Sequence, residues 1–264
     1  MPDAGKWIVL QCRLFFSALQ FFTRLPIPAW VGFDEIWLQH IARFFPLTGA
    51  VVAAAITFVA WSAGLLLPQP VAVLLAISSG LLLTGAFHED GFADVCDGFG
   101  GGANPARTLE IMKDSRVGAF GVLGIGMLLA IKCTALTSLP NKLMLASLFI
   151  AQPLSRLFAN VLMWRLDYAR TEGKAKPVAR RMTHHEFAFA FLSVLILVIL
   201  LLLAGLFSWQ QIFSGILPSM VATAYLTRLF LRRIGGYTGD CLGAVQQVAE
   251  TGFYLGILAC SRAI

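Results

Sequence analysis

Charged residues are scarce in this chain. They make up 13% of its 264 residues, against about 25% in an ordinary soluble domain. Hydrophobic residues make up 58%, and the mean hydropathy is +0.78. These values exclude both a water-soluble globular domain and an intrinsically disordered chain. The composition instead predicts an integral membrane protein, in which each helical span needs about 20 apolar residues.

Cysteine is also scarce, and its spacing fits no metal site or disulfide framework. The five cysteines are scattered and include no CxxC pair: Cys12, Cys96, Cys133, Cys241 and Cys260. Zinc sites and disulfide-rich folds are therefore not predicted. The net charge of +6 would suit a nucleic-acid partner. In a membrane chain, however, basic residues usually report topology, so no nucleic acid is expected.

Seven apolar stretches are long enough to cross a bilayer as helices. They are residues 46–67, 71–87, 118–138, 143–163, 186–207, 212–231 and 241–260. The second stretch is short for a span unless its helix continues past Phe87. The last stretch is the least apolar, because it carries Gln246, Gln247 and Glu250.

The N-terminal segment differs from these spans. Residues 7–22 are interrupted by polar side chains and lack a small-residue cleavage site, so they predict an interfacial amphipathic helix rather than a signal peptide. The chain is predicted to be an all-α polytopic membrane protein with one domain over residues 1–264. Residues 1–45 would be a cytoplasmic or interfacial segment, and 46–264 a bundle of about seven transmembrane helices, between six and eight.

Basic residues are unevenly distributed along the chain. If the N-terminus is cytoplasmic, 16 of the 20 lysines and arginines lie in the inside segments 1–45, 88–117, 164–185 and 228–240. The outside segments hold only Lys142 and Arg262. This asymmetry follows the positive-inside rule and predicts a cytoplasmic N-terminus. Because the outside connections are short, the chemistry is expected at the cytoplasmic face.

Acidic residues cluster in one polar segment, where residues 89–114 hold six of the 14 in the chain. On a helix that advances about 100° per residue, Asp90, Asp94 and Asp97 fall within an arc of about 60°. Like charges at this spacing destabilise a helix, and a cation would relieve the repulsion. Oxygen ligands without cysteine or paired histidine favour Mg²⁺, Mn²⁺ or Ca²⁺. The alternative is a solvated acidic helix end.

A glycine-rich turn over residues 98–102 follows and is either a hinge or a phosphate-binding loop. A second short helix then leads to Lys113, Asp114 and Arg116. Carboxylates for a metal beside cations for phosphate are the groups that phosphoryl transfer requires. The next span opens with four glycines that favour close helix packing: Gly118, Gly121, Gly124 and Gly126.

A second polar block, residues 235–244, precedes the last apolar stretch and lies on the same face in the predicted topology. Asp240 stands beside glycines at a helix start, so it is the better candidate for contact with substrate or metal. Glu250 lies more than two turns into the span and is predicted to face the bundle interior. A structural hydrogen-bonding role and a functional role are equally open for it.

These residues alone indicate a Mg²⁺-dependent membrane transferase that acts on a diphosphate. One alternative is an intramembrane prenyltransferase, which normally has two Asp-rich motifs related by an internal repeat; the second block here has only Asp240. The other alternative is a cation transporter. Its carboxylates should lie near the midplane on broken helices, whereas most carboxylates here cluster at one face.

Four blocks of sequence resemble the cobalamin synthase family, the membrane-bound adenosylcobinamide-GDP ribazoletransferases of bacterial vitamin B12 assembly. They are residues 21–28 (FFTRLPIP), 88–98 (HEDGFADVCDG), 110–121 (EIMKDSRVGAFG) and 236–244 (GYTGDCLGA). The blocks follow the order that the family shows, and they extend over nearly the whole chain. Glu89 departs from the family pattern, in which an apolar residue is expected.

The resemblance implies a Mg²⁺-dependent reaction in the bacterial cytoplasmic (inner) membrane. Adenosylcobinamide-GDP would be joined to α-ribazole or α-ribazole 5′-phosphate, giving adenosylcobalamin or its 5′-phosphate and releasing GMP. The lipid bilayer would surround the protein. A homo-oligomer and contacts with other enzymes of the corrinoid pathway are compatible with the resemblance.

The resemblance also implies roles for individual residues. Asp90, Asp94, Asp97 and Asp114 would hold Mg²⁺, and Asp94 or Asp97 would act as the catalytic general base. The remaining candidates would bind substrate: Glu89, Lys113, Arg116, Thr238, Asp240 and Glu250.

Overall fold

The structure is a computed structural model that describes residues 4–169, 178 and 181–263. Over these residues it contains ten α-helices, three short 3-10 helices and no β-strand. The all-α membrane architecture expected from the composition is confirmed. The basic inside segment 164–185 lies partly outside the described residues.

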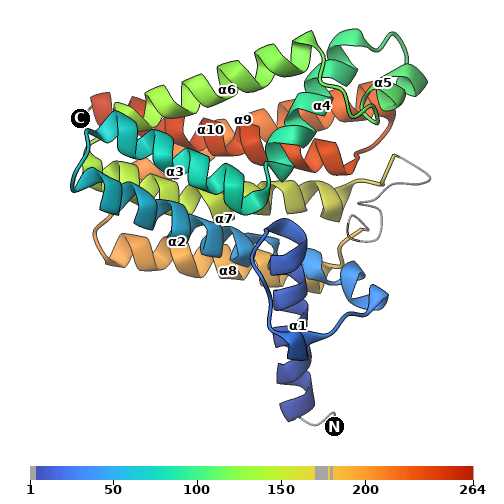
Figure 1. The fold of residues 1–264 in the computed structure, drawn as a ribbon, viewed down its shortest axis with the longest axis horizontal. Coiled ribbons are helices and arrows are strands. Elements are labelled where there is room, and N and C mark those ends of the chain that lie inside the picture. The colour runs from blue at the N-terminus through green and yellow to red at the C-terminus, as the bar shows by residue number, and fades with distance from the viewer. Residues whose placement is uncertain (1–3, 170–177, 179–180, 264) are drawn as a thin grey trace.

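The long helices run side by side as a bundle (Figure 1). They are α2 (Phe45–Gly64), α3 (Gln69–Thr84), α6 (Ala119–Thr137), α7 (Asn141–Arg165), α8 (His184–Leu203), α9 (Trp209–Ile234) and α10 (Gly239–Ala263). Two shorter helices, α4 (Phe87–Gly101) and α5 (Pro105–Ile111), lie at one end of the bundle together with the turn 235–238. This end is called the site end below.

Each of the seven predicted stretches coincides with a helix, and the described residues support five or six spans, of which six is the lower end of the predicted range of six to eight. Five segments are long and apolar enough to cross a membrane alone: Ile41–Gly64, α6, α7, α8 and α9. The helix α3 meets this test only together with α4, which would make a sixth span. The helix α10 is long enough at 25 residues, and its polar side chains explain why it is not among the candidate spans.

The helix of the second apolar stretch does not continue straight past Phe87. It ends at Thr84, and the chain turns by 89° before α4 begins. Gly85 and Ala86 both adopt left-handed backbone conformations, with φ of +68° and +56°. Each has the geometry that ends one helix and redirects the chain into the next.

The helix α10 lies in the interior of the bundle and is packed by α4, α6, α7 and α9. Its polar residues Gln246, Gln247 and Glu250 are all buried. All three side chains face other helices and not lipid. The helix α10 can therefore be stable inside the bundle although it is too polar for contact with lipid. The prediction that Glu250 faces the bundle interior is confirmed.

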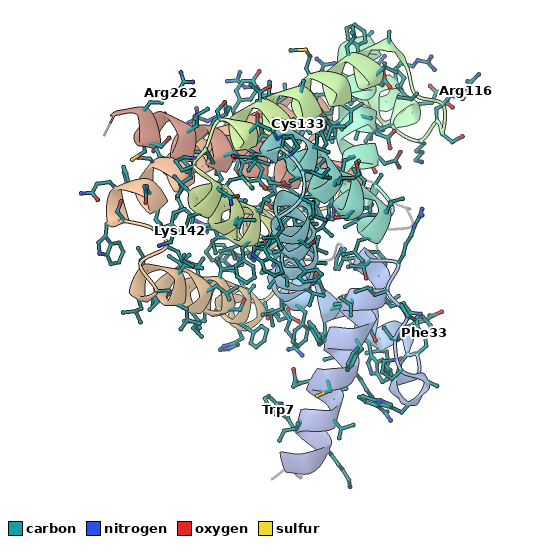
Figure 2. The ribbon with its side chains drawn as sticks, turned by 60° about the vertical axis from the view of Figure 1, so that its left-hand side comes forward. Trp7, Phe33, Arg116, Cys133, Lys142 and Arg262 are labelled. Atoms are coloured by element: carbon teal, nitrogen blue, oxygen red, sulfur yellow. The ribbon has the colours of Figure 1, made fainter. Side chains whose placement is uncertain are left out.

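The helix α1 (Ala4–Phe22) stands roughly perpendicular to the bundle beside the site end (Figure 1). Its second half packs through buried Leu14, Ala18 and Phe22, and 3-10 turns (Ala29–Val31, Glu35–Gln39 and Ile41–Phe44) connect it to α2. Its first half protrudes, and Trp7 is 57% exposed (Figure 2). A helix at right angles to the spans lies parallel to a membrane surface, as the interfacial prediction requires.

Candidate active site

The helix α4 carries the predicted acidic face at the site end. Asp90 is exposed, and Asp94 and Asp97 are partly exposed. The residues that α4 buries are others: His88, Gly91, Ala93, Val95 and Gly98. The aspartates therefore share the solvent-accessible side of a regular helix, as their spacing predicts.

Asp97 joins α4 to the start of α6. Its Oδ2 accepts a hydrogen bond from the Gly118 backbone N–H with an N–O distance of 2.7 Å, and its Oδ1 accepts one from Gly121 at 2.8 Å. Gly118 is the N-cap residue of α6 and has no side chain to satisfy these donors. Asp97 thus caps α6 from another helix, where a negative charge is favourable.

The glycines of α6 make room for α4. A Cβ atom at Gly118 would lie 2.5 Å from Asp97 Oδ1, and one at Gly121 would overlap Asp97 Oδ2. At Gly124 a Cβ would lie 2.5 Å from the Sγ atom of Cys96, which is the close helix packing that the sequence predicts. Sequence reasoning found this packing but missed the cap made by Asp97. The sequence did contain a sign of this cap: Asp97 is separated by one short helix from a span whose first turn carries Gly118 and Gly121.

Asp114 and Arg116 form an ion pair in the loop after α5. Arg116 Nη2 donates to Asp114 Oδ2 at 2.7 Å, and Arg116 Nε donates to Asp114 Oδ1 at 3.0 Å. These hydrogen bonds lower the pKa of Asp114 to about 2 and raise the pKa of Arg116. Lys113 is exposed next to the pair. The predicted metal ligand and the predicted phosphate-binding cation are therefore bonded to each other.

The acidic residues do not form a ready-made metal cage. Over the described part of the chain, no three His, Cys, Asp or Glu side chains are grouped closely enough to share an ion. The three aspartates of α4 follow one helix face, whereas Asp114 is paired with Arg116. Mg²⁺ commonly takes one or two protein carboxylates and completes its shell with water and substrate phosphates. A Mg²⁺ ion bound by one or two of these carboxylates would need water or ligand oxygens to complete its shell.

The start of α10 brings the second polar block against α4. The buried Thr238 donates from Oγ1 to Asp240 Oδ2 at 3.2 Å and accepts from the Cys241 backbone N–H at 3.4 Å. A Cβ atom at Gly91 would lie 3.0 Å from both Cα and the carbonyl oxygen of Asp240. The first turns of α4 and α10 are thus in contact, and the acidic segment and the second polar block share one end of the bundle as predicted.

Tyr237 fixes the turn before α10. Its backbone N–H donates to the Asp167 carbonyl at 3.2 Å, and its carbonyl accepts from Ala169 at 2.8 Å. The ring is buried and meets the ring of Tyr168 edge-on. Burial, together with nearby Tyr168 and Asp167, raises the pKa of Tyr237 far above its ordinary value. The phenol therefore stays neutral and serves to hold the turn.

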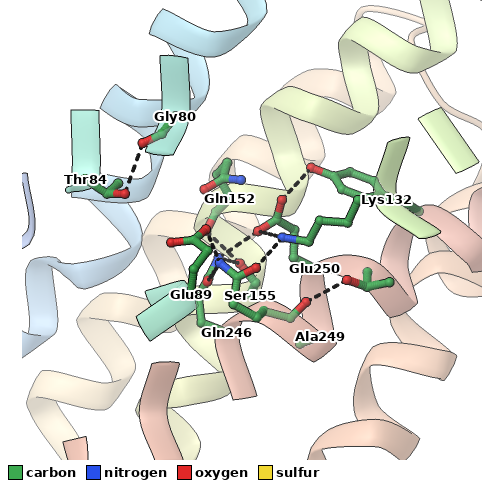
Figure 3. Close-up of polar contacts among 12 residues, drawn as sticks. Gly80, Thr84, Glu89, Lys132, Gln152, Ser155, Gln246, Ala249 and Glu250 are labelled. Carbon is green, nitrogen blue, oxygen red and sulfur yellow. Dashed lines mark hydrogen bonds and ion pairs between the residues drawn. The ribbon is translucent and has the colours of Figure 1, made fainter. Parts of the chain in front are cut away.

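Glu89 and Glu250 belong to a buried polar network in the bundle interior (Figure 3). Gln247 Nε2 donates to Glu89 Oε1 at 2.6 Å. Lys132 of α6 donates to Gln247 Oε1 at 2.6 Å and forms an ion pair with Glu250 Oε2 at 3.0 Å. Gln246 and Tyr254 donate the remaining hydrogen bonds to Glu250. The predicted contact of the two glutamates with substrate stays a prediction, and the network gives both of them structural partners.

Arg156 of α7 is the second cation in the interior and is 1% exposed. Its Nη1 donates to the carbonyl oxygen of Gln152 at 2.9 Å and to Gln152 Oε1 at 2.7 Å. Lys132 and Arg156 lie within the apolar stretches 118–138 and 143–163, and the sequence alone suggests no role for them. A cation inside an apolar span was itself the signal, since such a group is stable only beside polar partners.

A family model described as cobalamin-5-phosphate synthase matches residues 14–258 of the chain. The chain belongs to the cobalamin-5-phosphate synthase family. The resemblance inferred from four blocks is thereby confirmed. No solved structure matches the chain.

Three members of the cobalamin-5-phosphate synthase family, each named adenosylcobinamide-GDP ribazoletransferase, illustrate the likeness. The protein of Leptothrix cholodnii is 40% identical over 259 residues, which cover 96% of this chain and 97% of the relative. The protein of Shewanella frigidimarina is 40% identical over 269 residues, covering 98% of each chain. The protein of Ralstonia nicotianae is 44% identical over 247 residues, covering 90% and 92%.

The four blocks that carry the family resemblance all lie at the site end. Residues 88–98 form most of α4, 110–121 connect α5 to α6, and 236–244 open α10. Residues 21–28 span the end of α1 and the chain after it, and Arg24 donates from its backbone N–H to the Leu83 carbonyl at 2.7 Å. The four blocks, far apart in sequence, therefore meet at one end of the bundle.

Proposed function

We propose that this chain is a Mg²⁺-dependent adenosylcobinamide-GDP ribazoletransferase. It transfers the adenosylcobinamide-phosphate moiety of adenosylcobinamide-GDP to α-ribazole or α-ribazole 5′-phosphate, forms adenosylcobalamin or its 5′-phosphate, and releases GMP. Membership of the family supports the activity. The observation that carries the site is the contact between the first turns of α4 and α10, at Gly91 and Asp240, which brings Asp240 to the acidic segment of α4.

In this proposal Asp90, Asp94 and Asp97 hold Mg²⁺, with Asp114 joining them when Arg116 turns to a phosphate. Bound Mg²⁺ supplies charge neutralisation on the diphosphate and on the leaving GMP. Asp94 takes the role of general base. Asp97, whose two oxygens accept hydrogen bonds from α6, also orients the acidic face. Four further residues complete the substrate contacts. Lys113 and Arg116 bind phosphate oxygens, and Thr238 and Asp240 at the start of α10 bind the rest of the substrate.

The transfer exchanges one P–O bond for another. The ribose 3′-hydroxyl of the ribazole attacks the phosphorus nearer the cobinamide, and its proton passes to Asp94. The bond between that phosphorus and the oxygen of GMP breaks, and GMP leaves. Most of the rate enhancement expected of such a site comes from positioning and electrostatics.

The test is GMP release from adenosylcobinamide-GDP by the purified protein in lipid. Release should need both α-ribazole and Mg²⁺. Asp94→Asn should lower the rate by at least about 100-fold, because the amide is neither a base nor a good metal ligand. Glu110→Gln is the matched control, since Glu110 is exposed and paired with Arg107, and it should keep the wild-type rate. Release by Asp94→Asn at the wild-type rate, or without Mg²⁺, would contradict the proposal.

The site end is proposed to face the cytoplasm, and the distribution of basic residues supports this. Arg116 lies at the site end, and Lys142 and Arg262 lie at the opposite end (Figure 2). In a background without other cysteines, Arg116→Cys should react with an impermeant maleimide in inverted vesicles and not in whole cells. Lys142→Cys should show the reverse pattern. The opposite result for both variants would invert the proposed orientation.

A further inference from the structure

A small cavity lies inside the bundle beside the network of Glu89 and Glu250. Its volume is about 30 Å³, and residues of α2, α3, α4, α6, α7 and α10 line it. The wall from α2 and α3 is largely apolar and includes Ile56 and Ala76, while α4, α7 and α10 contribute charged and amide side chains. One water needs about 10–15 Å³ measured in this way, so the cavity has room for about two.

Three buried polar atoms in the lining residues have no hydrogen-bond partner among the described residues. They are Nε2 of His88, Oε2 of Glu89 and Nε of Arg156. His88 is 2% exposed and Arg156 is 1% exposed. Because a buried polar atom without a partner is strongly unfavourable, such atoms around one cavity indicate a bound molecule that supplies the missing hydrogen bonds.

The charges around the cavity decide which molecule fits. Glu89 and Glu250 bring two negative charges, and Lys132 and Arg156 bring two positive charges, so the lining is neutral overall. A cation would meet the guanidinium of Arg156, and an anion would meet the carboxylate of Glu89. Water both donates and accepts hydrogen bonds, carries no charge and has the right size.

We propose that this cavity binds about two ordered water molecules, which bridge His88 Nε2, Glu89 Oε2 and Arg156 Nε, and that Glu89 is thereby a positioning residue for the acidic face of α4. Glu89 Oε1 is tied to Gln247 of α10, and water ties Glu89 Oε2 to α7. The first turn of α4 is therefore held from inside the bundle. Asp90, the next residue, presents its carboxylate from that same turn.

The consequence for catalysis rests on the proposed function. A residue that fixes a functional group from behind commonly changes activity by about 10–100-fold when it is lost. Displacement of reacting groups by about 1 Å can cost about 100-fold in rate. Loss of Glu89 should therefore lower kcat while leaving the substrate contacts, and hence KM, nearly unchanged.

The water site is tested directly by a structure of the wild-type protein in nanodiscs, at a resolution that shows ordered water. Density for water within hydrogen-bond distance of Glu89 Oε2 and Arg156 Nε is the expected result. An empty cavity overturns the proposal, and so does density for a metal or halide ion. This measurement does not depend on any activity of the protein.

The positioning role is tested by amide hydrogen exchange of residues 87–101 in the full-length protein in lipid. Glu89→Leu removes both oxygens and should speed exchange of this segment by about tenfold or more, because its first turn opens more often. Glu89→Gln keeps an acceptor for Gln247 and a donor for water, so it should fall between wild type and Glu89→Leu. Ser219→Ala is the control, since it removes a buried hydrogen bond between α9 and α10 and should leave this segment unchanged.

The same variants are then compared for GMP release per folded molecule. Glu89→Leu should lower kcat by about 10–100-fold with KM for α-ribazole within about twofold, Glu89→Gln should restore part of the rate, and Ser219→Ala should keep it. Wild-type exchange of residues 87–101 in Glu89→Leu, or a wild-type kcat despite faster exchange, overturns the positioning role. If the wild-type protein releases no GMP at all, the proposed function fails. The water density and the exchange rates still test whether the cavity holds water and whether Glu89 stabilises the first turn of α4.

Discussion

Glu89 and Asp90 are adjacent carboxylates in the first turn of α4 and have opposite surroundings. Glu89 accepts from Gln247 inside the bundle, while Asp90 is exposed at the site end. Lys132 and Arg156 line the same cavity as Glu89 on the inner side of α4, and the outer side presents the aspartates. A carboxylate near a membrane thus takes its role from the groups that face it and not from its acidity alone.

The largest expected effect comes from removing the cation of the inner face. Lys132→Met leaves Glu250 buried without its ion-pair partner, which should lower the free energy of unfolding by about 3–5 kcal/mol. Unfolding in mixed micelles measures this loss. Lys113→Met is the control: Lys113 is exposed, so this variant should stay within about 0.5 kcal/mol of wild type. Equal unfolding free energies for the two variants would show that a buried cation contributes no more to stability than an exposed one.

An intermediate effect is expected where the outer face is attached to α6. Gly121→Ala places a methyl group on Asp97 Oδ2 and should displace the cap, with a loss of about 1–3 kcal/mol in unfolding free energy and a lower rate of GMP release. Gly126→Ala is the matched control in the same helix, because nothing lies within 4 Å of its Cβ position. That variant should be as stable as wild type or up to about 1 kcal/mol more stable. Similar losses in both variants would show that Asp97 is not a cap.

The smallest effect is expected at the exposed pair of Asp114 and Arg116. Folding lowers the pKa of Asp114 from 3.8 to about 2 through the hydrogen bonds from Arg116. A carboxyl group whose pKa is lower in the folded state contributes stability that is complete above its unfolded pKa and is lost as the pH falls through the folded pKa. The Tm of wild type should therefore fall slightly more than that of Asp114→Asn between pH 5 and pH 2. Parallel curves would show that the pair contributes nothing.

The outer face of α4 could be predicted from sequence because helix periodicity alone decides which residues share a side. The contact of Asp97 with α6 could not be predicted, since it depends on how two helices pack that are separated in sequence by the helix α5. Likewise, residues 71–87 form one apolar stretch in sequence. Nothing in the composition of Gly85–Ala86 indicates an 89° turn, because alanine seldom adopts a left-handed conformation.

Glu250 shows the same division between periodicity and packing. Its depth within the last stretch predicts that it faces the interior, and the structure confirms this. Its partner Lys132 lies more than 100 residues earlier in sequence, and no local pattern connects them. The polar residues of α10 also make it too polar to count among the candidate spans. These same residues form the buried network inside the bundle.

The turn between α3 and α4 has a consequence for recognition. Ala86 holds a conformation that disfavours residues with a side chain by about 1–2 kcal/mol, and Arg24 is packed against Gly85, where a Cβ would lie 2.6 Å from its Nε. Two glycines in open space would let the backbone take many conformations at this turn. Ala86 and the packed Gly85 restrict the backbone and fix the angle between α3 and α4. The acidic helix is thus presented at a preset angle. In the proposed function, a bulky corrinoid meets the acidic face at this fixed angle.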